Sequence, residues 1–238
     1  MNLFSPMEQY EIYSIFSLSM SFNNINFGLF IVMIICMAIP LLSSNHVVSH
    51  WWGIFNESLY RTLLSMVINY ISPKLIIFFP LIYTIFHLIL FSNLIGMIPY
   101  SSTPTVEIIM TLTLAFTILI GVLIMGFFSH KLLLFAAFLP AGTPIGLIFL
   151  MVPLEILAYL TRTFSLGLRL AVNLITGHIL AKVLIGFIWA AYLNNVSLIF
   201  LTLPLLLVSL FLSLELLIAY LQAYIFTFIT CITIRDIV

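Results

Sequence analysis

Charge is almost absent from this sequence. Of 238 residues, seven are Lys or Arg and seven are Asp or Glu, so 6% are charged while 64% are hydrophobic. A soluble domain of ordinary composition has about 25% charged residues. The composition therefore excludes a water-soluble protein and predicts an integral membrane protein in contact with the lipid bilayer. With so few cations, no basic surface for a nucleic acid is expected.

The residues and motifs of several chemistries are also scarce. The two cysteines, Cys36 and Cys231, lie in apolar runs near opposite ends of the chain, so we interpret them as buried apolar residues rather than a disulfide. His46 and His50 have the i,i+4 spacing of metal ligands, but no further ligands lie near them in the sequence. The chain has no phosphate-binding glycine loop and no nucleophile–base pair. We therefore expect no metal, no cofactor and no enzymatic activity of the chain on its own.

The first 26 residues contain Glu8 and Glu11 but no Lys or Arg. A secretory signal needs a basic start, and a mitochondrial presequence is rich in arginine. We therefore expect the chain to be synthesised close to the membrane it enters.

Long apolar runs predict an all-α membrane protein, with a single membrane domain over 1–238. A helix needs about 20 apolar residues to cross the hydrocarbon core. The runs 27–42, 75–98 and 108–129 are of about this length. They predict three ordinary membrane-crossing helices.

The last hundred residues predict a different arrangement. The segments 143–192 and 196–236 meet at Asn194 and Asn195, and each would be about 60 to 75 Å long as one helix. That is about twice the bilayer thickness, which ordinary tilt does not absorb. We predict two long, steeply tilted helices in a hairpin, with bends where Pro153 and Pro204 permit them, and five crossings in all.

The segment 49–72 is amphipathic. One face carries Ser58, Arg61, Thr62, Ser65 and Asn69, and the opposite face carries Trp52, Phe55, Leu59, Leu63 and Tyr70. This pattern predicts a helix lying in the membrane interface. The alternative, a further membrane-crossing helix, would bring Glu57, Arg61 and Asn69 into lipid.

The cations predict the orientation, because short loops on the cytoplasmic side are rich in Lys and Arg. Arg61, Lys74, Lys131 and Arg235 all fall on one side if the chain crosses five times, and the opposite loops carry no cation. The N-terminus is then outside and the C-terminus inside.

Polar residues at membrane depth are costly and are functional candidates. In the first long helix, Glu155, Arg162 and Arg169 are seven residues apart, so they share one stripe, whereas His178 lies about half a turn away from it. Glu215, Gln222 and Asp236 of the second helix also lie at multiples of seven. This spacing predicts two offset rows of polar groups that together resemble two half-channels.

Arg169 lies near the point where the two rows meet, too deep for its guanidinium to reach the surface. Arginine keeps its charge when buried, so it can attract a carboxylate without passing on a proton. Arg162 has a simpler interpretation, an ion pair with Glu155. His178 can equally be a structural histidine.

Three stretches carry a family resemblance. S-L-G-L-R-L-A-V-N-L-I-T-G-H at 165–178, E-L-L-I-A-Y-L-Q at 215–222 and N-L-I-G-M-I-P at 93–99 resemble the a subunit of rotary ATP synthases. The resemblance covers nearly the whole chain. It implies a proton-conducting stator subunit that binds no cofactor and works beside a ring of c subunits, peripheral-stalk subunits and other membrane subunits.

The resemblance also implies roles for individual residues. Arg169 corresponds to the essential arginine facing the c-ring, and Asn93 to a polar group that supports the site. The half-channel toward the outer side comprises Asn173, His178, Glu215 and Gln222. Glu155 and Asp236 belong to the opposite half-channel.

Two features of the resemblance indicate the mitochondrial type. Bacterial members typically have glutamate at the position of His178 and histidine at that of Glu215. The opening S-P-M-E-Q-Y-E-I is similar to mitochondrial members. The implied location is the mitochondrial inner membrane, with the N-terminus in the intermembrane space and the C-terminus in the matrix.

Two other classes of function stay open at this point. A secondary transporter would have an internal repeat and broken helices around a midplane site, and the sequence has no convincing repeat. A structural subunit of a respiratory membrane complex would anchor partners without moving protons. Intramembrane proteolysis is disfavoured because no paired catalytic residues are present.

Overall fold

The computed structural model describes residues 24–43, 51–70, 73–97, 104–131, 145–194 and 198–237. Every element in these ranges is helical, which confirms the all-α prediction. The predictions made for the first 23 residues, His46, His50 and Asn195 fall outside the described residues, as do the side chains of Trp52 and Lys74.

Six α-helices and two short 3-10 helices make up the described part of the chain. They are α1 (Asn24–Ser43), α2 (Trp51–Tyr70), η2 (Pro73–Phe78), α3 (Phe79–Gly96), η3 (Pro104–Val106), α4 (Ile108–His130), α6 (Ile145–Leu193) and α7 (Leu198–Ile237). Pro73 and Pro80 lie at or next to the starts of η2 and α3, where a missing N–H costs nothing.

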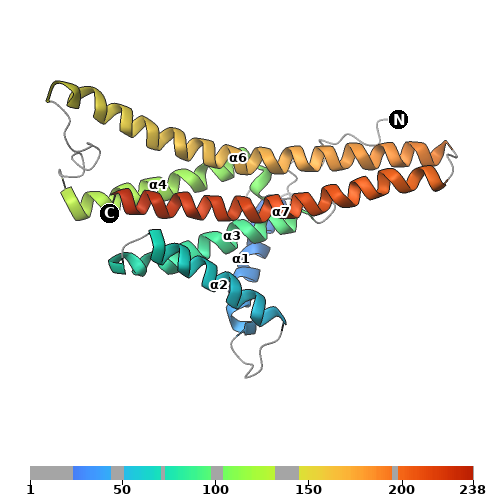
Figure 1. Ribbon diagram of the computed structural model, residues 1–238, viewed down its shortest axis with the longest axis horizontal. Helices are drawn as coiled ribbons and strands as arrows, with labels where there is room; N and C mark the ends of the chain where they lie inside the picture. The colour runs from blue at the N-terminus through green and yellow to red at the C-terminus, as the bar shows by residue number, and fades with distance from the viewer. Residues whose placement is uncertain are drawn as a thin grey trace, which may run out of the picture.

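The two longest helices form a hairpin. α6 has 49 residues and α7 has 40, and each continues through an internal proline, Pro153 or Pro204. Figure 1 shows the two helices running antiparallel, with α6 curving so that its first turns diverge from α7. The end where they are connected extends beyond the other described helices, so no other described helix lies against that part of the hairpin.

Four helical segments are long and apolar enough to cross a membrane. They are Ile76–Gly96, Ile108–Ser129, Phe149–Leu193 and Thr202–Ile237. In α1 the apolar stretch Phe27–Cys36 is shorter than these four. The described helices thus support a multi-pass membrane protein with four candidate spans.

The packed core lies where α2, α3, α4, α6 and α7 meet. Its largest fully buried side chains include Leu63 of α2, Ile82 and Phe86 of α3, and Phe226 and Ile234 of α7. α3 contacts α7 along its length, and α4 contacts α6. The core therefore holds the hairpin against the shorter helices and fixes the side of α6 and α7 that faces inward.

In α2, one stripe of side chains packs inward. Leu59 and Leu63 are buried together with Asn56, Met66 and Val67, and the predicted polar positions are exposed. Phe55 and Tyr70, which the sequence places on the apolar face, are 46% and 40% exposed. Contacts with α3 and α7 therefore cover only part of the apolar face.

Candidate functional site

A cavity of about 190 Å³ lies between α6 and α7, with α3 contributing to its wall. Four of its lining side chains are polar residues that the sequence singles out: Asn93, Asn173, Glu215 and Gln222. The others include Leu170, Leu174, Gly177, Phe211 and Ile218. A cavity of this size with several polar groups has room for several water molecules. The fold therefore brings polar residues from three separate segments to one cavity within the helices.

His178 and Glu215 face each other beside this cavity. The Nδ1 atom of His178 lies 3.8 Å from Oε1 of Glu215, and their side chains are only 15% and 6% exposed. This distance is too long for a direct hydrogen bond. Within the described part of the chain, neither Oε1 of Glu215 nor Nε2 of His178 has a hydrogen-bond partner. Both atoms are buried, and of the two residues Glu215 lines the cavity.

Asn93 joins α3 to the same site. Its side chain is fully buried, and Nδ2 donates a hydrogen bond of 3.5 Å to the backbone carbonyl of Ala219 in α7. Its Oδ1 atom has no partner among the described residues. A buried carbonyl oxygen without a donor is costly, so this atom is a further acceptor for water in the cavity.

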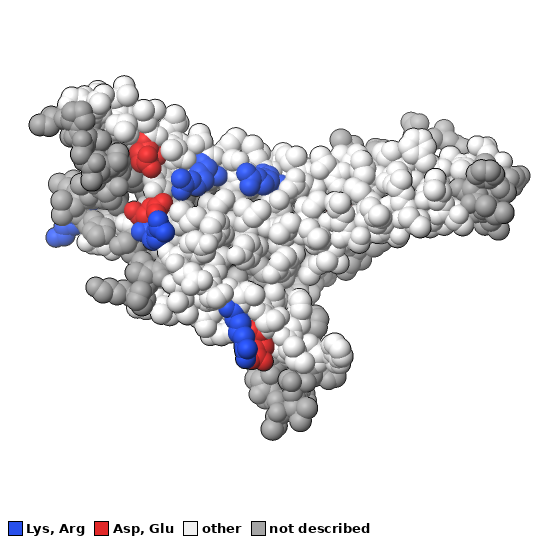
Figure 2. All heavy atoms as spheres, viewed as in Figure 1, with Lys and Arg blue, Asp and Glu red and all other residues white. Residues whose placement is uncertain are grey.

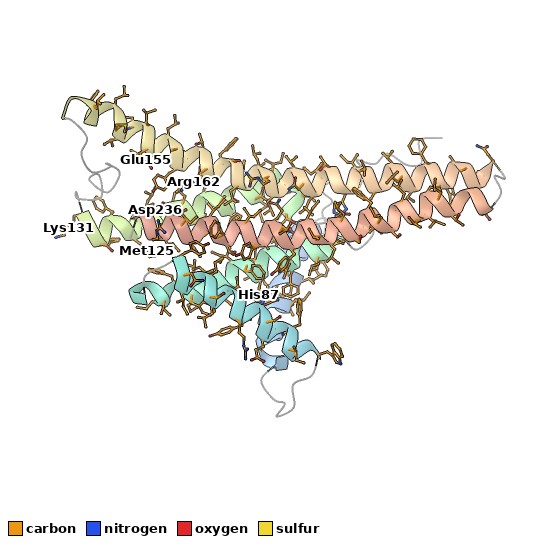
Figure 3. All side chains as sticks on the ribbon, in the orientation of Figure 1. His87, Met125, Lys131, Glu155, Arg162 and Asp236 are labelled. Carbon is orange, nitrogen blue, oxygen red and sulfur yellow. The ribbon has the colours of Figure 1, made fainter. Side chains whose placement is uncertain are left out.

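A second polar group lies near the C-terminal end of α7. The Tyr159 hydroxyl donates a hydrogen bond of 3.4 Å to Oδ2 of Asp236. The same oxygen is 3.9 Å from a guanidinium nitrogen of Arg162, and Oδ1 is 3.7 Å from Nε of Arg235. Figure 3 shows Glu155, Arg162 and Asp236 at one end of the hairpin, with Asp236 on α7 beside the other two on α6.

This geometry corrects the ion pair suggested from the sequence. Among the described residues, Arg162 pairs with Asp236 of the neighbouring helix and not with Glu155 of its own. Glu155 and Arg162 share a stripe, but they are seven residues apart, two turns of helix. The facing carboxylate of α7 is closer than a residue two turns away.

Tyr159 is a site residue that sequence reasoning missed. It is buried, its hydroxyl donates to Asp236, and the Arg162 guanidinium carbon lies 5.2 Å from the centre of its ring, within cation–π range. A signal was present: Tyr159 lies four residues after Glu155 and three before Arg162, so it shares their stripe.

Arg169 differs from the other two arginines of the hairpin, Arg162 and Arg235, which both lie near Asp236. Its side chain is exposed, and no ion pair or hydrogen bond is found for it within the described part of the chain. Along α6 it lies about 10 Å from Arg162 and about 14 Å from His178. Figure 2 shows that the visible charged residues gather over one half of the molecule, while the far end of the hairpin is uncharged in this view.

Several other buried polar groups in the described helices bond within their own helix. Thr227, Thr230 and Thr233 of α7 each donate to the carbonyl four residues earlier in that helix. His87 of α3 donates from Nδ1 to the carbonyl of Tyr83, at 2.9 Å, while its Nε2 atom has no partner among the described residues.

A model of the family described as ATP synthase A chain matches residues 25–235. The chain belongs to this family. It is 40% identical to ATP synthase subunit a of Emericella nidulans, over 98% of this chain and 96% of the relative. The corresponding protein of Neurospora crassa is 43% identical over 98% and 93%, and that of Chondrus crispus 39% identical over 98% and 95%.

Family membership confirms the resemblance stated from the sequence, and it does so over almost the full length of each relative. The chain is a subunit of the membrane sector of an ATP synthase and acts in a complex with other subunits. The most similar relatives include several from fungi, which agrees with the mitochondrial type indicated by His178 and Glu215.

Proposed function

We propose that this subunit conducts protons through two offset half-channels and couples their flow to rotation of a neighbouring ring of c subunits. Arg169 is the centre of the mechanism. The observation that carries this proposal is that an exposed arginine, with no ion-pair partner among the described residues, lies on α6 between two polar groups, each confined to its own part of the hairpin.

The outer half-channel comprises the cavity and the residues around it. Protons enter through water in the cavity, and His178 and Glu215 bind and pass them. Asn173, Gln222 and Asn93 hold the water in place. Imidazole and carboxylate groups exchange protons rapidly with water near neutral pH, whereas the amides only orient it. The cavity volume and the two unpartnered atoms of His178 and Glu215 support this role.

The inner half-channel ends at Glu155 and Asp236. The Asp236 carboxylate lies near Arg162 and Arg235, and its oxygens can accept a proton and release it to water. Tyr159 and Arg162 hold Asp236 in position through the contacts described above. The proximity of this group to the C-terminus supports its assignment to the inner side, as the cation distribution predicts.

Arg169 separates the two paths and acts on a carboxylate of the ring. A permanent charge exposed to lipid is costly, and no carboxylate pairs with it in the described part of this chain. A ring subunit that presents an ionised carboxylate to Arg169 would remove that cost. The guanidinium does not give up its proton, so protons do not pass directly from one half-channel to the other.

The transport cycle follows from these roles. A proton from the outer half-channel neutralises the ring carboxylate, which can then rotate into lipid, because a neutral acid is far less costly there than an anion. After the ring has turned, the carboxylate releases its proton to the inner half-channel. Moving one charge through 100 mV gives about 2.3 kcal/mol. Several protons are therefore needed for each ATP, which is made in another part of the complex.

The arrangement in the membrane completes the proposal. α1 is the fifth crossing, α2 lies in the interface, and α6 and α7 are steeply tilted. The N-terminus faces the intermembrane space and the C-terminus the matrix of the mitochondrion. Partners are the c-ring, the peripheral stalk and other membrane subunits.

The alternative function, a secondary transporter, fits less well because α6 and α7 pass the cavity as unbroken helices.

The test is the Arg169→Ala variant in the whole ATP synthase, reconstituted in liposomes. We expect ATP synthesis driven by a proton gradient to be lost and passive proton leak to rise. Arg61→Ala is the control, since Arg61 lies on α2 and pairs with Glu57. Wild-type coupling in Arg169→Ala would contradict the proposal. Near-normal coupling in Arg169→Lys would favour a purely structural subunit.

A further inference from the structure

Three glycines of α6 differ in what an added side chain would touch. At Gly167, a Cβ atom would lie 3.1 Å from the backbone oxygen of Thr111 and 3.2 Å from Cα of Leu112, both in α4. At Gly186 it would meet nothing within 4 Å. At Gly177 it would lie 2.7 Å from Oε1 of Glu215. Each glycine therefore has a different neighbour, and only one faces a candidate proton-transfer group.

The three nearest atoms to this Cβ position at Gly177 all belong to the Glu215 side chain. They are Oε1 at 2.7 Å, Cδ at 3.2 Å and Cγ at 3.6 Å. Two non-bonded atoms do not approach to 2.7 Å when one is a methyl carbon, because carbon contacts are optimal at about 3.5 to 4.0 Å. The carboxyl group of Glu215 thus occupies the space in which any other residue would have its side chain.

Helix formation does not explain the glycine. Gly177 lies well inside α6, where glycine is less favourable than alanine. Glu215 is 5% exposed, and within the described part of the chain its Oε1 atom makes no hydrogen bond. No hydrogen bond within that part therefore holds this oxygen in place. It lies in the space next to the α-carbon of Gly177 that a side chain would otherwise fill.

We propose that Gly177 is a positioning residue for Glu215. By having no side chain, it lets the carboxyl group lie against α6, on the wall of the cavity and 3.8 Å from His178. The consequence for proton transfer rests on the function proposed above. The steric relationship itself does not.

The competing explanation is that Gly177 only lets two helices pack closely. Gly167 is the residue for which that explanation holds, because its neighbours in α4 include backbone atoms that cannot move without the helix. The neighbour of Gly177 is the end of a flexible side chain. Gly177→Ala should therefore leave assembly intact and displace only Glu215, whereas Gly167→Ala should impair packing of α4 on α6.

The experiment compares Gly167→Ala, Gly177→Ala and Gly186→Ala in the intact ATP synthase. All three make the same chemical change in one helix. For Gly177→Ala we expect a normal yield of complex and a loss of ATP-driven proton pumping of about tenfold, the order expected for a misplaced proton-transfer group. Gly186→Ala should pump like the wild type. Gly167→Ala should lower the yield or thermal stability of the complex.

Two further measurements separate positioning from packing. Glu215→Asp is one methylene shorter, so in that background Gly177→Ala should cause little additional loss; an equal loss in both backgrounds would overturn the proposal. In a density map of the Gly177→Ala complex, the distance between His178 and Glu215 should increase, and an unchanged distance would also overturn it. If Glu215→Gln pumps like the wild type, the proposed function fails instead, while the map still decides the role of Gly177.

Discussion

His178 and Glu215 lie on different long helices, yet Nδ1 of one is 3.8 Å from Oε1 of the other. The contact requires α6 and α7 to pack in one register, and it brings an imidazole next to a carboxyl group that lines the cavity. At this distance, under the proposed function, a proton passes between the two groups through one water molecule.

This pair gives the first prediction. Glu215→Gln removes the proton acceptor but keeps the shape, so ATP synthesis should slow while the complex assembles normally. The exchange variant, His178→Glu with Glu215→His, restores one imidazole and one carboxyl group at the contact. We expect it to transport protons faster than either single variant. Proton pumping and ATP synthesis by proteoliposomes, normalised to the amount of assembled complex, measure both effects.

A control accompanies this prediction. Thr227→Val on α7 removes a buried hydroxyl that donates within its own helix, and it should leave proton transport close to that of the wild type. Unchanged flux in Glu215→Gln across the pH range would show that this carboxyl group does not carry protons.

The second prediction concerns Asp236 and Arg162. Their atoms are 3.9 Å apart and their side chains are 28% and 40% exposed, so the pair should stabilise the protein by no more than about 1 kcal/mol. Asp236→Asn should therefore leave thermal stability nearly unchanged, yet slow ATP synthesis, because the amide cannot accept and release a proton. Thermal unfolding and ATP synthesis of the purified complex are the two measurements.

The matched variant for this prediction is Arg235→Gln. Arg235 also lies near Asp236, with Nε 3.7 Å from Oδ1, but its side chain is 57% exposed. We expect Arg235→Gln to slow ATP synthesis less than Arg162→Gln does, because the Arg162 guanidinium packs against the ring of Tyr159. A larger effect of Arg235→Gln than of Arg162→Gln would contradict the arrangement described for the inner group.

The third prediction concerns the depth of α2. Ile54 and Ile68 are both about half exposed and lie 14 residues apart, about 21 Å along the helix. If α2 lies in the interface, fluorescent labels at these positions should be quenched equally by lipids brominated at one depth. If α2 crosses the bilayer, their depths should differ by about 20 Å. Labels at Ile109 and Phe128, near the two ends of α4, provide the contrast.

The sequence predicted those features that depend on spacing within one helix. The lengths of the apolar runs predict long helices, and the intervals of seven place Glu155, Arg162 and Arg169 on one stripe. The separation of His178 from that stripe likewise follows from helix geometry alone. Each of these inferences needs only the period of the α-helix and the thickness of the bilayer.

Features that depend on packing between helices could not be predicted in the same way. The partner of Arg162, the role of Tyr159 and the space above Gly177 are set by the register of α7 against α6. The exposed positions of Phe55 and Tyr70 are set by which side of α2 meets α3 and α7. Hydrophobic patterning specifies a face only approximately, and a few ångströms decide which polar atoms meet.

The most direct test of the account is a density map of the assembled ATP synthase at a resolution that shows side chains. The account predicts that the guanidinium group of Arg169 faces the ring of c subunits, with a ring carboxyl group close enough for an ion pair. It also predicts that water reaches Arg169 from opposite sides by two paths that do not join. An Arg169 side chain that turns away from the ring and pairs with a carboxylate of its own chain would contradict it.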